Sequence, residues 1–205
     1  MGVKIKTKAG KEIVAPAGHE VKLGGLTEPT PYRIEAGWDG VKADIDISVI
    51  GRDNPGESWL ACYHDDLNPE PWIEHSSDDT TGESSQGGAD EWINITDANQ
   101  ADPKIAVLDV FVNVDQVNSA GLCWGDFTEL FVEITDKNGN KIRVEQVAFD
   151  LMAVTDYSMH VARITRKPDG WYLKEVSNKY RGYTGDAQNP VIQSFADQML
   201  PPGDM

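Results

Sequence analysis

The sequence predicts an all-β protein, an antiparallel β-sandwich with acidic loops and one helix near its C-terminus. Two observations favour the strands: many short runs alternate apolar with polar residues, and Gly, Pro, Asn and Asp residues separate them. A third observation is that helical spacing of apolar residues occurs only late in the chain. The 205 residues show no internal repeat or linker, so we expect a single domain, with N-terminal strands in 1–31, a core in 32–183 and a helix in 189–200.

The first segments are predicted to be short strands. Val3 to Lys8 alternates apolar residues with lysines on one face, which is a common way to blunt a sheet edge. Short segments follow at 12–14 and 19–23, and two prolines delay the next strand until 32–38.

The strand predicted over 43–50 carries carboxylates on one face. Its apolar residues alternate with Asp44, Asp46 and Ser48, so these polar residues share the opposite face. A solvated face would explain the pattern. However, Asp is depleted in strands, and two on one face suggest a purpose.

An acidic loop over 74–91 follows the next predicted strand, 59–63, which ends near Asp65 and Asp66. The loop contains six carboxylates, three glycines and no Lys or Arg. Such a loop presents hard oxygen ligands, of which Ca²⁺ favours six to eight. A solvated surface loop is the alternative interpretation of the same composition.

The second half of the chain is predicted to contain further strands, one hairpin turn and a final hairpin. Further strands are predicted over 92–95, 104–114, 129–134 and 141–147. Asp136 to Asn140 resembles the opening of an EF-hand loop, but the ligand pattern is incomplete, so we interpret it as a hairpin turn. The closing hairpin pairs 158–166 with 171–176, and His160 within it is interpreted as a structural residue.

The helix predicted over 189–200 has both a cap and an apolar stripe. Asn189 can cap it and Pro190 suits its first turn. The stripe consists of Val191, Ile192, Phe195 and Met199. We expect this stripe to pack on the sandwich, and docking of a partner is the alternative.

Composition excludes several classes of partner. The formal net charge of -16, from 34 acidic and 18 basic residues, argues against nucleic acid and anionic membranes. No apolar run is long enough to insert into a membrane, and the first ten residues do not resemble a signal peptide, so a cytoplasmic location is expected. Cys62 and Cys123 are predicted to be free buried thiols.

Catalytic motifs are missing from the sequence, and we expect no enzyme. There is no Gly-x-Ser-x-Gly elbow, no phosphate-binding Gly-Lys-Ser/Thr loop and no His pair at helical ligand spacing. A carbohydrate-binding or carbohydrate-cleaving module is the lowest-ranked alternative. It would use paired carboxylates and a site lined by Trp38, Trp59, Trp72 and Trp92.

Several short motifs, in order along the chain, resemble the TerD-domain family of tellurite-resistance and stress-response proteins. The resemblance covers roughly residues 32–183, and its motifs are specific as a series rather than singly. They are Gly37-Trp38, Ala43 to Ser48, Tyr63 to Leu67, Glu74 to Glu83, Gly88 to Glu91, Lys104-Ile105, Gly125 with Phe127, Phe149 to Leu151, and Asp169 to Trp171.

The resemblance implies a Ca²⁺-binding β-sandwich without catalysis, with a cytoplasmic stress or resistance role through partner proteins. By motif match, the implied Ca²⁺ ligands are Asp44, Asp46, Asp65, Asp66, Asp78, Asp79, Glu83, Asp90 and Glu91, with Thr81 and Gly82 offering backbone or hydroxyl oxygens. The alternative role is a structural or decoration subunit of a virion or other large intracellular particle, acting by self-assembly.

The acidic loop departs from the family pattern in ways that affect its second half. Ser77 to Asp79 stands where the family usually has Gly-Asp-Asn, 84–88 is longer and less acidic than usual, and Ala89 replaces an expected carboxylate. One of the calcium sites is therefore expected to be weakened or lost. The half over 78–83 should bind metal more dependably than the half over 87–91.

Overall fold

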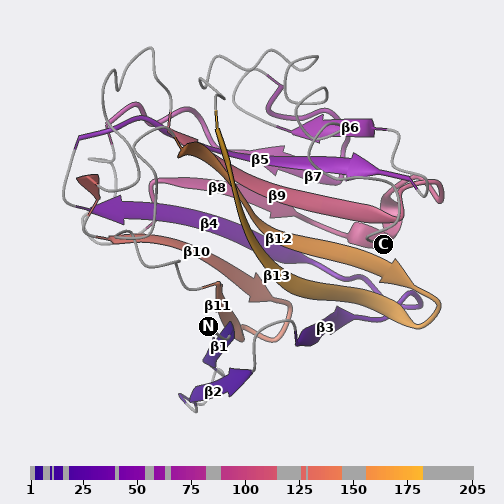
Figure 1. The fold of residues 1–205 in the computed structure, drawn as a ribbon. Helices are drawn as coiled ribbons and strands as arrows, with labels where there is room; N and C mark the ends of the chain where they lie inside the picture. The colour runs from indigo at the N-terminus through magenta and orange to yellow at the C-terminus, as the bar shows by residue number, and fades with distance from the viewer. Residues whose placement is uncertain are drawn as a thin grey trace.

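The computed structural model describes residues 3–6, 10, 12–15, 19–39, 42–53, 58–62, 66–81, 89–114, 126–127, 129–144 and 156–181. These ranges contain thirteen strands and one short 3-10 helix, η1 (Ala98–Gln100), and no α-helix lies within them. The strands form two antiparallel sheets, which confirms the all-β prediction (Figure 1). The helix predicted over 189–200 lies outside the described residues.

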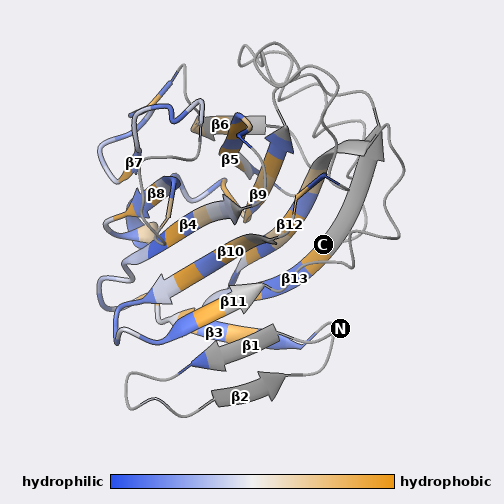
Figure 2. Ribbon diagram, turned by 90° about the vertical axis from the view of Figure 1, so that its left-hand side faces the viewer, coloured by the Kyte–Doolittle hydropathy of each residue, from blue (hydrophilic) through white to orange (hydrophobic). Residues whose placement is uncertain are grey.

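One sheet has seven strands in the order β2-β1-β11-β10-β4-β8-β7. Figure 2 shows this sheet, with hydrophilic and hydrophobic residues alternating along β4 and β10. The bounds are β1 (Val3–Lys6), β2 (Glu12–Ala15), β4 (Tyr32–Asp39), β7 (Ile73–His75), β8 (Glu91–Ile95), β10 (Glu129–Asp136) and β11 (Lys141–Val144). Two of the predicted N-terminal strands, β1 and β2, therefore lie at one end of this sheet, with β2 at its edge, whereas the third, near 19–23, belongs to the other sheet.

The other sheet has six strands in the order β3-β13-β12-β9-β5-β6. Its bounds are β3 (Glu20–Gly24), β5 (Ile45–Arg52), β6 (Ser58–Cys62), β9 (Val107–Val114), β12 (Asp156–Lys167) and β13 (Gly170–Arg181). β12 and β13 form the predicted closing hairpin, with Thr165 opposite Tyr172. An irregularity in the pairing between His160 and Ala162 allows Val161 and Ala162 both to reach the core.

The two sheets share one hydrophobic core, because a single cluster of buried side chains draws on both. Ile34 and Ile134, which pair across β4 and β10, contribute from the seven-stranded sheet. Ile47, Leu108 and Ile164 contribute from the six-stranded sheet. Alternation in the sequence predicts these inward faces correctly, since period-2 geometry places every second residue on one side of a strand.

Part of the opposite face of the six-stranded sheet, on β5 and β9, is buried as well. Asp46, Ser48 and Arg52 on β5 alternate with the core residues and are nearly inaccessible. Phe111 on β9 is equally buried. The interpretation of this β5 face as a solvated surface is therefore wrong, because the sheet is covered on both sides at these positions.

Asp109 is the centre of a buried ionic cluster on this covered face. Arg163 Nε donates to its Oδ1 at 2.8 Å, and Arg52 Nε lies 3.3 Å from its Oδ2. His160 Nε2 lies 2.9 Å from Oδ1, and the His160 ring stacks on Phe111. Burial pushes the pKa of Asp109 upward, but the contacts with His160 and Arg163 outweigh it, and the pKa is lowered. His160 is thus a structural residue whose acidic partner comes from a neighbouring strand.

The turn over 136–140 is a hairpin turn, as predicted. Asp136 Oδ1 accepts hydrogen bonds from the backbone N–H groups of Asn138 and Asn140 at 2.8 and 2.9 Å. Gly139 has a φ of 76°, a conformation that glycine adopts without strain. The Asp136 carboxylate therefore closes the turn rather than opening an EF-hand loop.

Cys62 is a buried free thiol, as predicted. Burial, together with the nearby Asp66 and Glu74 carboxylates, raises its pKa to about 12. Cys123 lies outside the described residues. Among the described helices, none has the length and apolar character needed to cross a bilayer.

Candidate metal site

Three of the predicted ligands converge at the start of β5. Asp44 directly precedes β5, Asp46 is its second residue, and Asp78 lies in the loop that follows β7. Each offers a carboxylate oxygen, and these three oxygens all lie within 4.8 Å of one another. Asp44 and Asp46 are only 2% and 5% exposed, whereas Asp78 is exposed. We call these residues the Asp trio.

The loop after β7 is held against β8 where it begins. Ser76 N donates to Trp92 O at 2.8 Å, and Trp92 N donates to Ser76 Oγ at 3.1 Å. Farther along, Asp79 Oδ1 accepts from both the N–H and the hydroxyl of Thr81 at 3.0 and 3.1 Å. These contacts fix the chain on both sides of Asp78, so its carboxylate is presented toward β5.

Glu91, the first residue of β8, connects the loop to β5. Its side chain is fully buried, and its Oε2 accepts from Ile47 N at 2.8 Å. Its Oε1 accepts from Asp79 N at 3.4 Å. Burial raises the pKa of Glu91 well above its ordinary value, and the negative charges of Asp46 and Asp78 raise it further.

His75 is a buried contributor that the sequence analysis did not single out. Its Nδ1 lies 2.7 Å from Ser76 O, and its Nε2 lies 2.8 Å from Ile47 O. Carbonyl oxygens only accept, so both contacts are hydrogen bonds when both ring nitrogens carry protons. The resulting positive charge would lie beside Glu91, whose Oε2 is 3.9 Å from Nε2. The sequence signal is alternation in β7, where Ile73 and His75 point inward and Glu74 outward.

The other predicted ligands have different positions. Asp90 Oδ2 accepts from Trp38 N at 3.1 Å, and Asp90 N donates to Ala36 O, so this residue is tied to β4. Asp66 lies near Cys62 and does not belong to the Asp trio. Asp65, Gly82 and Glu83 lie outside the described residues, so their assignment as ligands stays a prediction.

The donor chemistry of the Asp trio fits a hard cation. Calcium–oxygen bonds of about 2.3–2.6 Å place two ligands of one ion at most about 5 Å apart. The spacing of the trio is within this limit, so a single ion could contact all three carboxylates. Two of the three are buried, and gathering like charges away from water is unfavourable unless a cation compensates them.

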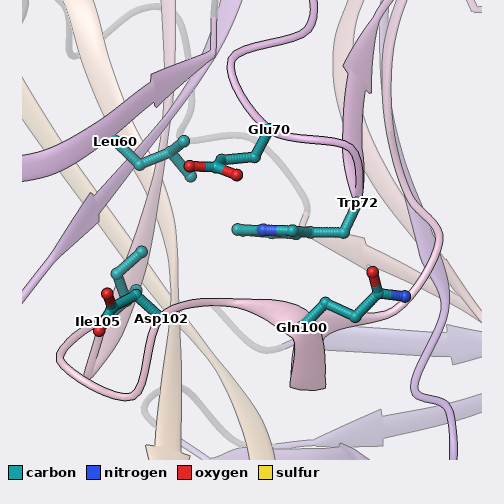
Figure 3. Close-up of a pocket in the computed structure, with 6 residues that line it drawn as sticks. All are labelled: Leu60, Glu70, Trp72, Gln100, Asp102 and Ile105. Atoms are coloured by element: carbon teal, nitrogen blue, oxygen red, sulfur yellow. The ribbon is translucent and has the colours of Figure 1, made fainter.

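A separate pocket of about 350 Å³ is lined by Leu60, Glu70, Trp72, Gln100, Asp102 and Ile105. Figure 3 shows the Trp72 indole extending between Glu70 and Gln100. The indole is nevertheless buried, as is that of Trp38.

The tryptophans do not support the carbohydrate-binding alternative. The Arg33 guanidinium lies 4.3 Å from the Trp92 ring centroid and covers it. Trp38 and Trp72 are buried, and the side chain of Trp59 lies outside the described residues. A sugar-stacking platform requires an open aromatic face, which the described tryptophans do not provide together.

Comparison with known proteins gives a consistent result. The family model for the TerD domain matches residues 17–188. Among solved structures, a homologue of telluride resistance protein (TerD) from Streptomyces coelicolor A3(2) has a TM-score of 0.65 at 19% identity, covering 85% of this chain and all of that one. A protein of unknown function, SAV2460, has a TM-score of 0.61 at 16% identity, covering 80% of this chain and 97% of that one. A search of curated proteins found no match. At these identities the structural likeness establishes the fold.

Proposed function

Because the chain belongs to the TerD-domain family, we propose that its acidic site binds Ca²⁺ and that the protein acts without catalysis, through protein partners, in tellurite resistance or a stress response. The family match supports the class of function. The Asp trio supports the metal, and it is the single observation that carries the proposal.

The trio brings together carboxylates that are distant in the sequence. Asp44 and Asp46 come from β5 and Asp78 comes from the loop after β7, so one ion would join the two segments. The ion would add positive charge to this acidic junction. Three carboxylates leave room for water or backbone oxygens, because Ca²⁺ takes six to eight ligands.

Calcium binding is tested by calorimetric titration of Ca²⁺ into protein from which metal has been removed with a chelator. The midpoint of thermal unfolding is measured with and without Ca²⁺. We expect Ca²⁺ to bind and to raise the midpoint, because a ligand that binds only the folded state stabilises it. Asp46→Asn should weaken binding strongly. Asp169→Asn removes the same charge from the exposed β12–β13 turn and should bind Ca²⁺ as the wild type does. Wild-type protein that gives neither binding heat nor a midpoint shift would refute the proposal.

Partner binding is tested separately from metal binding. The tagged protein is incubated with lysate in Ca²⁺ and, in parallel, in chelator, and the retained proteins are identified by mass spectrometry. We expect partners that are retained by the wild type in Ca²⁺ and lost from Asp46→Asn. A set of retained proteins that is identical in all samples would argue against action through a calcium-dependent surface.

A further inference from the structure

At the edge of β5 beside the Asp trio, side chains from the other sheet contact the backbone. The paired residues of β6 end at Cys62, opposite Val49 of β5. At Ile47, two residues earlier, the N–H group donates to Glu91 and the carbonyl accepts from His75. Glu91 and His75 belong to the other sheet, so they connect the two sheets at this edge.

Glu91 binds two backbone N–H groups, and each belongs to the residue that follows a member of the Asp trio. Ile47 follows Asp46, and Asp79 follows Asp78. One fully buried carboxylate therefore sets how far the β5 segment lies from the loop. Both of its oxygens are used for this purpose in the described structure.

We infer that Glu91 is a positioning residue of the metal site, holding Asp46 and Asp78 at the separation one cation requires, in place of the ligand role implied by the family resemblance. The inference rests on the proposed calcium function. His75 supports the same arrangement, because its two ring nitrogens lie 2.7 Å from Ser76 O and 2.8 Å from Ile47 O, and its Nε2 lies 3.9 Å from Glu91 Oε2. A carboxylate fixed in this way can orient the ligands, as residues that contact metal ligands without binding the metal commonly do.

The test measures backbone amide hydrogen exchange by NMR in the full-length protein after metal has been removed with a chelator. Without metal, Glu91 cannot affect exchange by acting as a metal ligand. In Glu91→Gln only one side-chain oxygen remains to accept, so at least one of the amides of Ile47 and Asp79 should exchange about five- to tenfold faster. Glu91→Leu removes both acceptors and should affect both amides. If this variant does not fold, the Gln variant decides the question. Unchanged exchange of both amides in Glu91→Gln would overturn the inference.

Calcium titration of three variants then distinguishes a positioning role of Glu91 from a ligand role and from a general effect on stability. Both Glu91→Gln and Asp78→Asn should weaken Ca²⁺ binding about ten- to a hundredfold. However, Asp78→Asn should leave the metal-free exchange of Ile47 unchanged. Ile134→Val, in the core of β10, should lower the thermal midpoint, raise exchange without selectivity for Ile47 and Asp79, and leave Ca²⁺ affinity unchanged. Glu91→Gln behaving like Ile134→Val would overturn the positioning role.

The two proposals fail in different ways. A wild type that binds no Ca²⁺ refutes the proposed function, and with it the role of Glu91 toward a metal. A wild type that binds Ca²⁺ while Glu91→Gln keeps wild-type amide exchange overturns only the inference.

Discussion

Asp109 supplies the negative charge that balances the buried cationic side chains on the covered face of the six-stranded sheet. Its carboxylate is fully buried and contacts His160, Arg163 and Arg52. Asp109→Asn should therefore lower the free energy of unfolding by about 3–5 kcal/mol, because it leaves buried cationic groups without their counter-charge. Urea denaturation at neutral pH measures this loss, with the exposed Asp102→Asn as the matched control.

The lowered pKa of Asp109 predicts how stability changes with pH. Its folded pKa lies below the unfolded value, so the ionised carboxylate stabilises the folded state at pH values above the unfolded pKa of about 3.9. That contribution is lost as the pH falls through the folded pKa. Denaturation midpoints measured from about pH 6 down to about pH 3 should fall less steeply for Asp109→Asn than for the wild type. Parallel curves would contradict the assignment.

His75 should contribute to stability even without metal. His75→Ala leaves the buried Ile47 carbonyl without its side-chain donor, which should cost about 1–3 kcal/mol. Urea denaturation of the chelated protein measures this cost. His19 is exposed and directly precedes β3, and His19→Ala should leave the midpoint unchanged. Equal effects of the two substitutions would show that the Ile47 contact adds nothing.

At the scale of elements, the β12–β13 turn depends on a glycine. Gly170 has a φ of 153°, and a Cβ there would lie 2.1 Å from Gly24 O on the neighbouring β3. Gly170→Ala should destabilise the protein by about 1–3 kcal/mol, because the clash is with backbone and the φ is strained. Gly25→Ala meets no atom within 4 Å and is the control in a thermal melt. Equal melting temperatures for the two variants would refute the clash.

Strands and their inward faces could be predicted from the sequence, whereas the contacts between strands could not. Alternation identified the core side of β5 and β9, and an Asn-Gly pair identified the turn after β10. Sequence could not show that the outer face of β5 is covered. It also could not pair His160 with Asp109, because the two residues are far apart in the chain and meet only through sheet order.

Several residues of the candidate site could be predicted from the sequence, but most of the contacts between them could not. Asp44, Asp46 and Asp78 were predicted ligands, and the fold brings them together. The backbone contacts of Glu91 depend on where β6 ends relative to β5, which residue spacing does not reveal. His75 was overlooked because the alternation that places it inward spans only three residues and is a weak signal.

At the scale of the whole molecule, Ca²⁺ should stabilise the fold because the chain carries a large net negative charge. The chain carries a net charge of -16, and the Asp trio concentrates part of it at one junction. Ca²⁺ at about a hundredfold excess over its dissociation constant should stabilise the protein by about 2.7 kcal/mol. Urea denaturation in Ca²⁺ and in chelator measures this difference. Raising monovalent salt should reduce the general repulsion in both samples and leave most of the difference in place.

The contacts of Glu91 and His75 also bear on how this sequence can vary. Both side chains bind the backbone of Ile47, while the Ile47 side chain packs in the core. Position 47 can therefore exchange one hydrophobic residue for another without altering the groups that hold the Asp trio. The core and the candidate metal site meet at this residue, yet substitutions can accumulate in the core while the candidate site is retained.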